Sequence, residues 1–365
     1  MKHTYFLLLG LLIVILMTSC AHLQSSGGEI IHINLSDAKS NLPLSACVDT
    51  IRSVKLKLPK PYFFGIVTEV LSTDSSYYLV DEKQCVVFQF SKDGTFLNTI
   101  GTRGQGPGEI SGMSSFFLGD SCVYICDLGV RKIYSYASDG QFIKENSFPY
   151  SLIFDNIVAL PHGRFLCHRM SNDEGDNKGL WVMNEQGQKI KQLISYPPCA
   201  YVYSDWNTLY TGKKGVIEIH NPMNGKYYSM NTSNDSLVEI MQQQIDMKTL
   251  VDFKDADNTR NIKEDYAYSP FVINGNHSIF SLWMLSDNKI ACSVYSKESK
   301  KVKVGKFFDM DIPGYTQFGT PISSNIPNTL TTIMTDEVPL DHFPEQYQEL
   351  DIDERVAILN FMELN

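Results

Sequence analysis

Residues 78–97 of this chain read YLVDEKQCVVFQFSKDGTFL, and residues 124–143, which lie 46 positions further on, read YICDLGVRKIYSYASDGQFI. The two stretches share Tyr, Asp, Asp-Gly and Phe in one register, and aromatic or aliphatic residues replace one another between them. Short apolar runs that are separated by turn dipeptides and repeat at a period near 45 are typical of β-propeller blades. The sequence therefore predicts an all-β fold of repeated antiparallel sheets.

Within each repeat the pattern is strand, turn, strand, turn. Asp93-Gly94 stands between two apolar runs, and an Asp-Gly pair in this position predicts a hairpin with a type I′ turn, in which both central residues take positive φ. Looser copies of the block are expected over residues 163–187, 215–230 and 278–295. Six four-stranded blades of about 45 residues each then account for most of residues 29–365.

The ends of the chain are expected to close this ring. The last strand, Val356 to Leu364, is predicted to pair with a strand from the amino-terminal part of the chain, either Glu29–Ile33 or Val54–Leu58. Such a pairing removes a free sheet edge.

Residues 236–251 depart from the strand rhythm. Ser236 and Glu239 have the spacing of a capping box. Apolar residues follow at helical spacing, namely Leu237, Ile240, Met241, Ile245 and Leu250. The pattern predicts a short helical insertion.

The amino terminus has the features of a lipoprotein signal. A short basic start precedes an apolar run from Tyr5 to Leu16, which is shorter than the roughly 20 residues of a membrane span. Met17 to Cys20 resembles a bacterial lipobox, so we expect a signal peptide over 1–19, lipid attachment at Cys20, a flexible tether over 20–28 and the propeller over 29–365. The alternative is an ordinary secretory signal.

Composition narrows the possible partners. The net charge is −10 and no cluster of Lys or Arg occurs, which argues against nucleic acid as a partner. Eight cysteines become seven if Cys20 is lipidated, and most lie in apolar runs, so buried thiols are expected.

Residues 101–109 read GTRGQGPGE and are rich in glycine. They lack the Gly-Lys-Ser/Thr ending of a phosphate-binding loop, and an apolar strand pattern follows them, so they favour a crossover between blades. The longer pattern from Phe90 to Glu109, FSKDGTFLNTIGTRGQGPGE, resembles the six-bladed β-propeller lipoproteins common in Bacteroidetes, which are related in fold to NHL and TolB-like propellers. The lipobox and residues 353–358 fit the same family. The resemblance implies the fold and a place in the cell envelope, and it implies no reaction and no catalytic residues.

One face of the propeller is expected to carry a binding site. The turn between the second and third strands of a blade emerges on the same face as the crossover to the next blade. The candidate ligand-binding residues of this face are Asp81, Arg103, Gln105, Asp127, Arg131, Tyr203 and Trp206. Aromatic rings beside carboxylates and amides suit a glycan or a peptide. Asp81 and Asp127 could instead satisfy turn backbone, and Tyr203 and Trp206 could instead pack between blades.

These patterns favour a membrane-anchored, non-enzymatic binding or scaffold module for a glycan, a peptide or an envelope protein, on the periplasmic side of the envelope. The alternative is a metal-dependent hydrolase or lyase with its site on the propeller axis. No catalytic signature and no metal-ligand spacing is visible in the sequence, so no cofactor is expected. Calcium at Asp173, Glu174 and Asp176 is an alternative to a solvated loop there.

Overall fold

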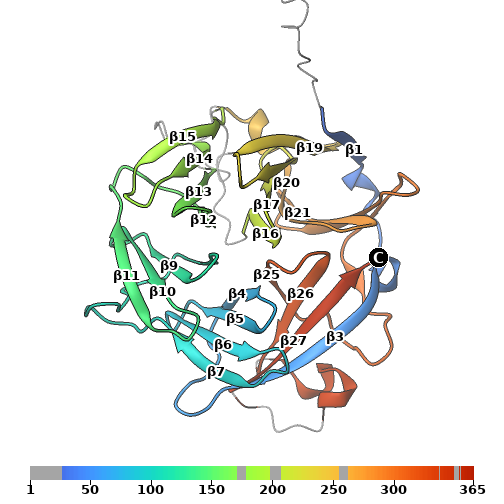
Figure 1. The fold of residues 1–365 in the computed structure, drawn as a ribbon. Coiled ribbons are helices and arrows are strands. Elements are labelled where there is room, and N and C mark those ends of the chain that lie inside the picture. The colour runs from blue at the N-terminus through green and yellow to red at the C-terminus, as the bar shows by residue number, and fades with distance from the viewer. Residues whose placement is uncertain are drawn as a thin grey trace, which may run out of the picture.

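The computed structural model describes residues 27–170, 178–197, 207–254, 262–336, 338–348, 353 and 355–365. Figure 1 shows strands that form antiparallel sheets arranged around a central axis. The helical segments of these ranges are 3-10 helices of 3 residues each, namely η1 (Leu35–Asp37), η2 (Leu44–Ala46), η3 (Leu250–Asp252), η5 (Leu340–His342) and η6 (Glu345–Tyr347). The prediction of an all-β, propeller-like fold is confirmed.

Each of the two repeated stretches lies within a unit of four antiparallel strands. The first unit, which is half of an eight-stranded sheet, consists of β4 (Val67–Ser72), β5 (Ser76–Asp81), β6 (Val86–Ser91) and β7 (Phe96–Ile100). The second consists of β8 (Ser115–Leu118), β9 (Val123–Asp127), β10 (Lys132–Tyr136) and β11 (Phe142–Ser147). Every residue of β5 is buried. The nearly continuous apolar sequence of this strand, SYYLVD, is expected of a strand that is covered on both faces.

The Asp-Gly hairpins are real, but they are not the expected type I′ turns. Only the glycine of each pair has positive φ, 89° at Gly94 and 86° at Gly140. The Gly94 N–H donates to the Ser91 carbonyl at 3.0 Å, and the Ser91 N–H donates to the Thr95 carbonyl at 2.9 Å. A three-residue loop with glycine at the left-handed position has this pattern, so it requires glycine at one position only.

The looser copies also form sheets. One sheet contains β12 (Asn156–Leu160), β13 (Arg164–Arg169), β14 (Gly179–Met183) and β15 (Lys189–Ile194). The next contains β16 (Leu209–Lys213), β17 (Val216–Asn221), β18 (Lys226–Asn231) and β19 (Ser236–Ile245). A further sheet contains β20 (Ala267–Asn274), β21 (Ser278–Leu285), β22 (Ile290–Ser296) and β23 (Val302–Gly305). Large side chains fill the spaces between neighbouring sheets, for example Trp181 and Phe165.

The two ends of the chain share the last sheet. Its carboxy-terminal strands are β25 (Thr320–Ser324), β26 (Thr329–Met334) and β27 (Val356–Leu364), and β3 (Val48–Lys57) pairs antiparallel with β27. β25 also pairs in parallel with β4, where Ser323 lies opposite Glu69. Of the two candidate closing strands, the one around Val54 is therefore the partner of β27. The β25–β4 pairing then joins the last four-stranded unit to the first.

The other candidate strand lies elsewhere in the ring. β1 (Glu29–Ile33) adds a fifth strand, parallel to β19, to the sheet that β16 begins. A short parallel pair of β2 (Leu42–Pro43) and β24 (Phe308–Asp309) follows along the chain. The amino-terminal segment therefore contacts three sheets before the first repeated block begins.

The predicted helical insertion over 236–251 is wrong. Residues 236–245 form β19, and a register shift beside Tyr227 leaves Ile240 as an extra residue in that strand. Such a bulge places apolar residues on both sides of it at spacings of three and four, which imitate a helix. A capping box does occur just downstream, between Thr249 and Asp252, and it begins only the single turn η3.

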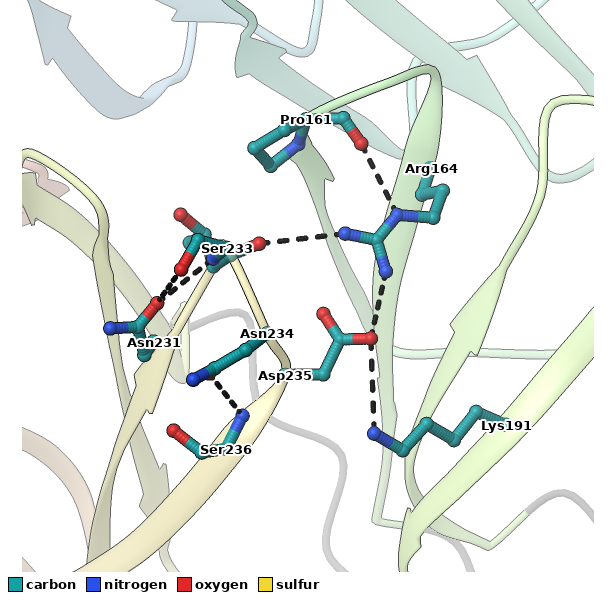
Figure 2. A network of polar contacts seen from close by, with 9 residues as sticks. Pro161, Arg164, Lys191, Asn231, Ser233, Asn234, Asp235 and Ser236 are labelled. Carbon is teal, nitrogen blue, oxygen red and sulfur yellow. Dashed lines mark hydrogen bonds and ion pairs between the residues drawn. The ribbon is translucent and has the colours of Figure 1, made fainter.

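A polar network connects the sheet of β12–β15 to the sheet of β16–β19 (Figure 2). The Arg164 guanidinium donates to Asp235 Oδ2 at 2.7 Å and to the carbonyls of Pro161 and Thr232 at 3.2 and 3.4 Å. Lys191 Nζ lies 3.9 Å from the same Asp235 oxygen. The Asp235 side chain is only 10% exposed, so its ion pair with Arg164 is largely shielded from water.

We expect Asp235→Asn to lower the free energy of unfolding by about 1–3 kcal/mol, because it leaves the partly buried guanidinium without its charged partner. Glu145→Gln is the matched control, since Glu145 pairs with Lys132 on the surface, where removal of an ion pair costs about 0–1 kcal/mol. Urea denaturation of both variants measures the difference. Equal losses in the two variants would show that the network does not hold these sheets together.

Candidate functional site

The first strands of the sheets surround the axis, and β4, β12, β16 and β25 lie nearest the centre in Figure 1. A cavity of about 500 Å³, including its open mouth, lies at the end of the axis where β4 and β12 begin. Hydrogen-bonding side chains dominate its lining, namely Thr68, Glu69, Glu82, Ser114, Ser115, Asn156, Asn207 and Ser323. Val80, Met113, Phe116 and Ile157 complete it. One small space therefore brings together residues of β4, β8, β12 and β25, and Asn207 just before β16.

A β-bulge sets the position of Glu69. Val67 lies opposite Asp81 and Glu69 lies opposite Val80, so Thr68 is an extra residue in β4. Both Thr68 and Glu69 consequently line the cavity, whereas strict alternation would put one of them on the other face of the strand.

Glu69 has little compensation for its charge. Its Oε1 accepts a hydrogen bond from Asn207 Nδ2 at 3.1 Å. Burial raises the pKa of the Glu69 carboxyl to about 7; the Asn207 hydrogen bond lowers it and the nearby Glu82 carboxylate raises it further. A ligand that donates hydrogen bonds or carries positive charge would stabilise the ionised form.

A chain of buried hydrogen bonds supports the wall of the cavity. Thr208 Oγ1 donates to Asn156 Oδ1 at 2.5 Å, which leaves it to accept from His168 Nδ1 at 2.6 Å. His168 Nε2 then accepts from the Tyr196 hydroxyl at 2.8 Å. His168 is fully buried, and burial lowers its pKa to about 3, so the neutral ring holds Asn156 in its orientation.

The predicted site residues Asp81 and Asp127 occupy equivalent places in the first two sheets, and both are buried. Asp81 accepts hydrogen bonds from the backbone of Gly65 and Gln84 at 2.6 and 3.0 Å. Asp127 accepts from the backbone N–H groups of Gly112 and Gly129 at 2.8 and 2.9 Å, among others. Both carboxylates therefore accept hydrogen bonds from turn backbone, which is the alternative to ligand binding that the sequence suggests for them.

Arg103 and Gln105 are exposed in the crossover between β7 and β8. This loop folds over one of its own side chains, because the Gly106 N–H donates to Glu109 Oε2 at 2.8 Å. Arg131, at the turn before β10, donates to the Leu152 carbonyl at 3.3 Å and lies 5.3 Å from the centre of the Tyr150 ring. Arg103, Gln105 and Arg131 share the face that bears the cavity mouth, as the strand directions require.

Several predicted residues lie outside the described ranges, namely Cys20, Asp173, Glu174, Asp176, Tyr203 and Trp206.

Within the described ranges no group of 3 or more His, Cys, Asp or Glu side chains is placed to hold a metal ion. The cysteines of these ranges are free, and all except Cys122 are buried, as expected. None of the helices in this part of the chain has the length and apolar character of a membrane span.

The sequence reasoning missed Glu69, Asn156 and Asn207. Glu69 is a single acidic residue inside the otherwise uncharged strand VTEVLS, and an isolated charge in a predicted innermost strand is the signal that could have indicated it. The two asparagines carry no such signal, because asparagine is also an ordinary turn residue.

Comparisons with known proteins agree with this fold. A Bacteroides fragilis protein described as exported has a solved structure that matches with a TM-score of 0.73 and 17% identity, over 92% of this chain and 99% of that one. A member of the DUF4221 family from Bacteroides vulgatus matches with a TM-score of 0.54 and 9% identity, over 87% and 98% of the two chains. At identities this low, the similarity shows a shared fold and no shared function.

At the level of sequence no curated protein matches. The model of the domain of unknown function DUF4934 matches residues 29–362, which include the repeated blocks, the axial cavity and most of the closing strand β27. The chain belongs to the DUF4934 family.

Proposed function

We propose that this protein is a lipid-anchored, exported, six-bladed propeller that binds a ligand without chemical turnover at the mouth of its axis. Six antiparallel units support the blade count when the eight-stranded sheet is divided between β25 and β4. The structural match to a Bacteroides protein described as exported and the lipobox at Cys20 support the location in the envelope.

The observation that carries the proposal is the composition of the axial cavity. Among the described residues, its lining offers two carboxylates, two amides and several hydroxyls and contains no Lys or Arg. Such a lining accepts hydrogen bonds from a ligand, so it suits the hydroxyls of a glycan or the amino group of a peptide. Arg103 and Gln105 are exposed on the same face and could contact the parts of the ligand outside the cavity.

A thermal-shift screen of the purified protein against saccharides, peptides and divalent ions tests this function. A ligand that binds only the folded state adds about 2.7 kcal/mol at a hundredfold excess over its Kd. Stabilisation by a saccharide or a peptide is the expected result. No shift by either class would contradict binding of these ligands, and stabilisation by calcium or zinc alone would favour the metal-dependent hydrolase or lyase.

We expect Glu69→Gln to weaken binding of the stabilising ligand at least tenfold, because the variant loses the charged acceptor of the cavity. Glu298→Gln is the matched control, because Glu298 is exposed in the turn between β22 and β23. Calorimetric titration of both variants measures the change. Unchanged binding by Glu69→Gln would place the ligand elsewhere on the protein.

A further inference from the structure

A second cavity lies toward the opposite end of the axis, where β16, β20 and β25 end. It encloses about 500 Å³, including its open mouth. Its walls are more apolar than those of the first cavity and include Phe271, Ile273, Ile326 and Pro327, together with the rings of Tyr210 and Tyr227.

The carboxylate inside this cavity is already paired, whereas the buried Tyr210 hydroxyl has no hydrogen-bond partner among the described residues. Glu218 Oε1 accepts from Lys213 Nζ at 2.7 Å, and Glu218 Oε2 accepts from the Tyr227 hydroxyl at 2.9 Å. A ligand therefore finds apolar surface in the cavity and no free acidic group among these residues.

Lys297 is bonded to Asn274, which lines the cavity, and it has no carboxylate partner of its own among the described residues. Lys297 Nζ donates to Asn274 Oδ1 at 2.8 Å and also to the carbonyl of Gly275, and both acceptors are neutral. The two carboxylates near enough to affect it are Glu218 and Glu29. Glu218 pairs with Lys213, and Glu29 pairs with Lys300 at 2.7 Å.

This arrangement leaves one positive charge in excess beside an apolar cavity. Lys297 is partly buried, and burial together with the positive charge of Lys213 lowers its pKa. An anion at this position would reverse both effects, since an opposite charge favours the protonated lysine.

We propose that this cavity binds an amphipathic anion, with the apolar body against Phe271, Ile273 and Ile326 and the acidic head group facing Lys297. The class includes free carboxylic acids with a hydrocarbon or aromatic body. This cavity and the axial cavity at the other end have no lining residue in common.

Titration of the purified protein with sodium decanoate tests the proposal, with decanol as the uncharged probe and decyltrimethylammonium as the cationic one. Decanoate is expected to bind at least tenfold more tightly than either of the others. Lys297→Gln should weaken decanoate binding at least tenfold and leave decanol binding unchanged, because it removes only the charge. Ile326→Trp should block both probes by filling the cavity.

Two controls keep the outcomes separate. Lys303→Gln removes an exposed lysine from the outer strand β23 of the same sheet and should leave decanoate binding unchanged. Glu69→Gln should also leave it unchanged, so the test does not depend on the ligand of the axial cavity. Equal binding of decanoate and decyltrimethylammonium, or full decanoate binding by Lys297→Gln, would overturn the proposal.

Discussion

Leu56→Ala is expected to lower the free energy of unfolding by about 2–5 kcal/mol, the usual cost of emptying a well-packed leucine site. Leu56 is a completely buried residue of β3, and it lies opposite Ala357 of β27. It belongs to one apolar cluster with Leu359 and Ile333 of the last sheet and Leu79 and Phe88 of the first. The lost side chain therefore weakens both the β3–β27 pairing and the contact between the sheets that close the ring.

Urea denaturation of the variant measures this loss. Lys55→Ala is the matched control in the same strand, because Lys55 is exposed, and surface changes of this kind shift stability by about 0.5 kcal/mol or less. If the two variants were equally stable, closure of the ring by β3 would not be an important source of stability.

Acidification from pH 7 to pH 4.5 is expected to destabilise the protein through His168 and His220. Both are fully buried, and burial lowers the pKa of each to about 3. In the unfolded chain a histidine takes up its proton near pH 6.5, so the unfolded state binds protons that the folded state refuses. The contribution of the neutral histidines to the free energy of unfolding is therefore complete above pH 6.5. It falls between pH 6.5 and 3, by roughly 2.7 kcal/mol for each histidine at pH 4.5.

Glu69 opposes this trend. Its pKa is raised to about 7 in the folded protein, so the folded state binds the Glu69 proton at a higher pH than the unfolded state does. The contribution of Glu69 to the free energy of unfolding is complete below the pKa that its carboxyl has in the unfolded chain, and it is lost as the pH rises through 7. Glu69→Gln should therefore make the loss of stability between pH 6.5 and 4.5 steeper than in the wild type.

His220 allows a direct test of the histidine contribution. Neither of its ring nitrogens has a hydrogen-bond partner among the described residues. His220→Phe should cost little at pH 7.5, and it should reduce the acid-induced loss of stability by about half, since one of two buried histidines is removed. Denaturation curves at several pH values measure the slope. His277→Gln, at an exposed histidine, is the control, and an unchanged slope in His220→Phe would contradict the assignment.

The parts of the fold that could be predicted depend on local pattern. The repeat at 46 residues, the Asp-Gly turns and the buried strand β5 follow from short-range alternation and turn chemistry, which adjacent residues largely determine. An amino-terminal partner for the last strand was predictable because a propeller needs one, but only the pairing with β27 selects the strand around Val54 over Glu29–Ile33. The helix expected over 236–251 failed because a bulged strand and a helix can share the same apolar spacing, and only pairing with β18 and β1 separates them.

By itself the sequence determined the class of fold, the repeated unit and the face that carries the crossover loops, because these depend on residues close together in the chain. Only the tertiary structure decided the composition of the cavities. Glu69 and Ser323 lie on paired strands, Asn156 begins β12, and Asn207 precedes β16, so the four side chains meet only when the ring closes. The Glu218–Lys213 pair is local to the β16–β17 hairpin, but the Glu29–Lys300 pair forms only because β1 packs beside the sheet of β20–β23. The distance between such groups depends on how whole sheets pack, and no local pattern in the chain encodes it.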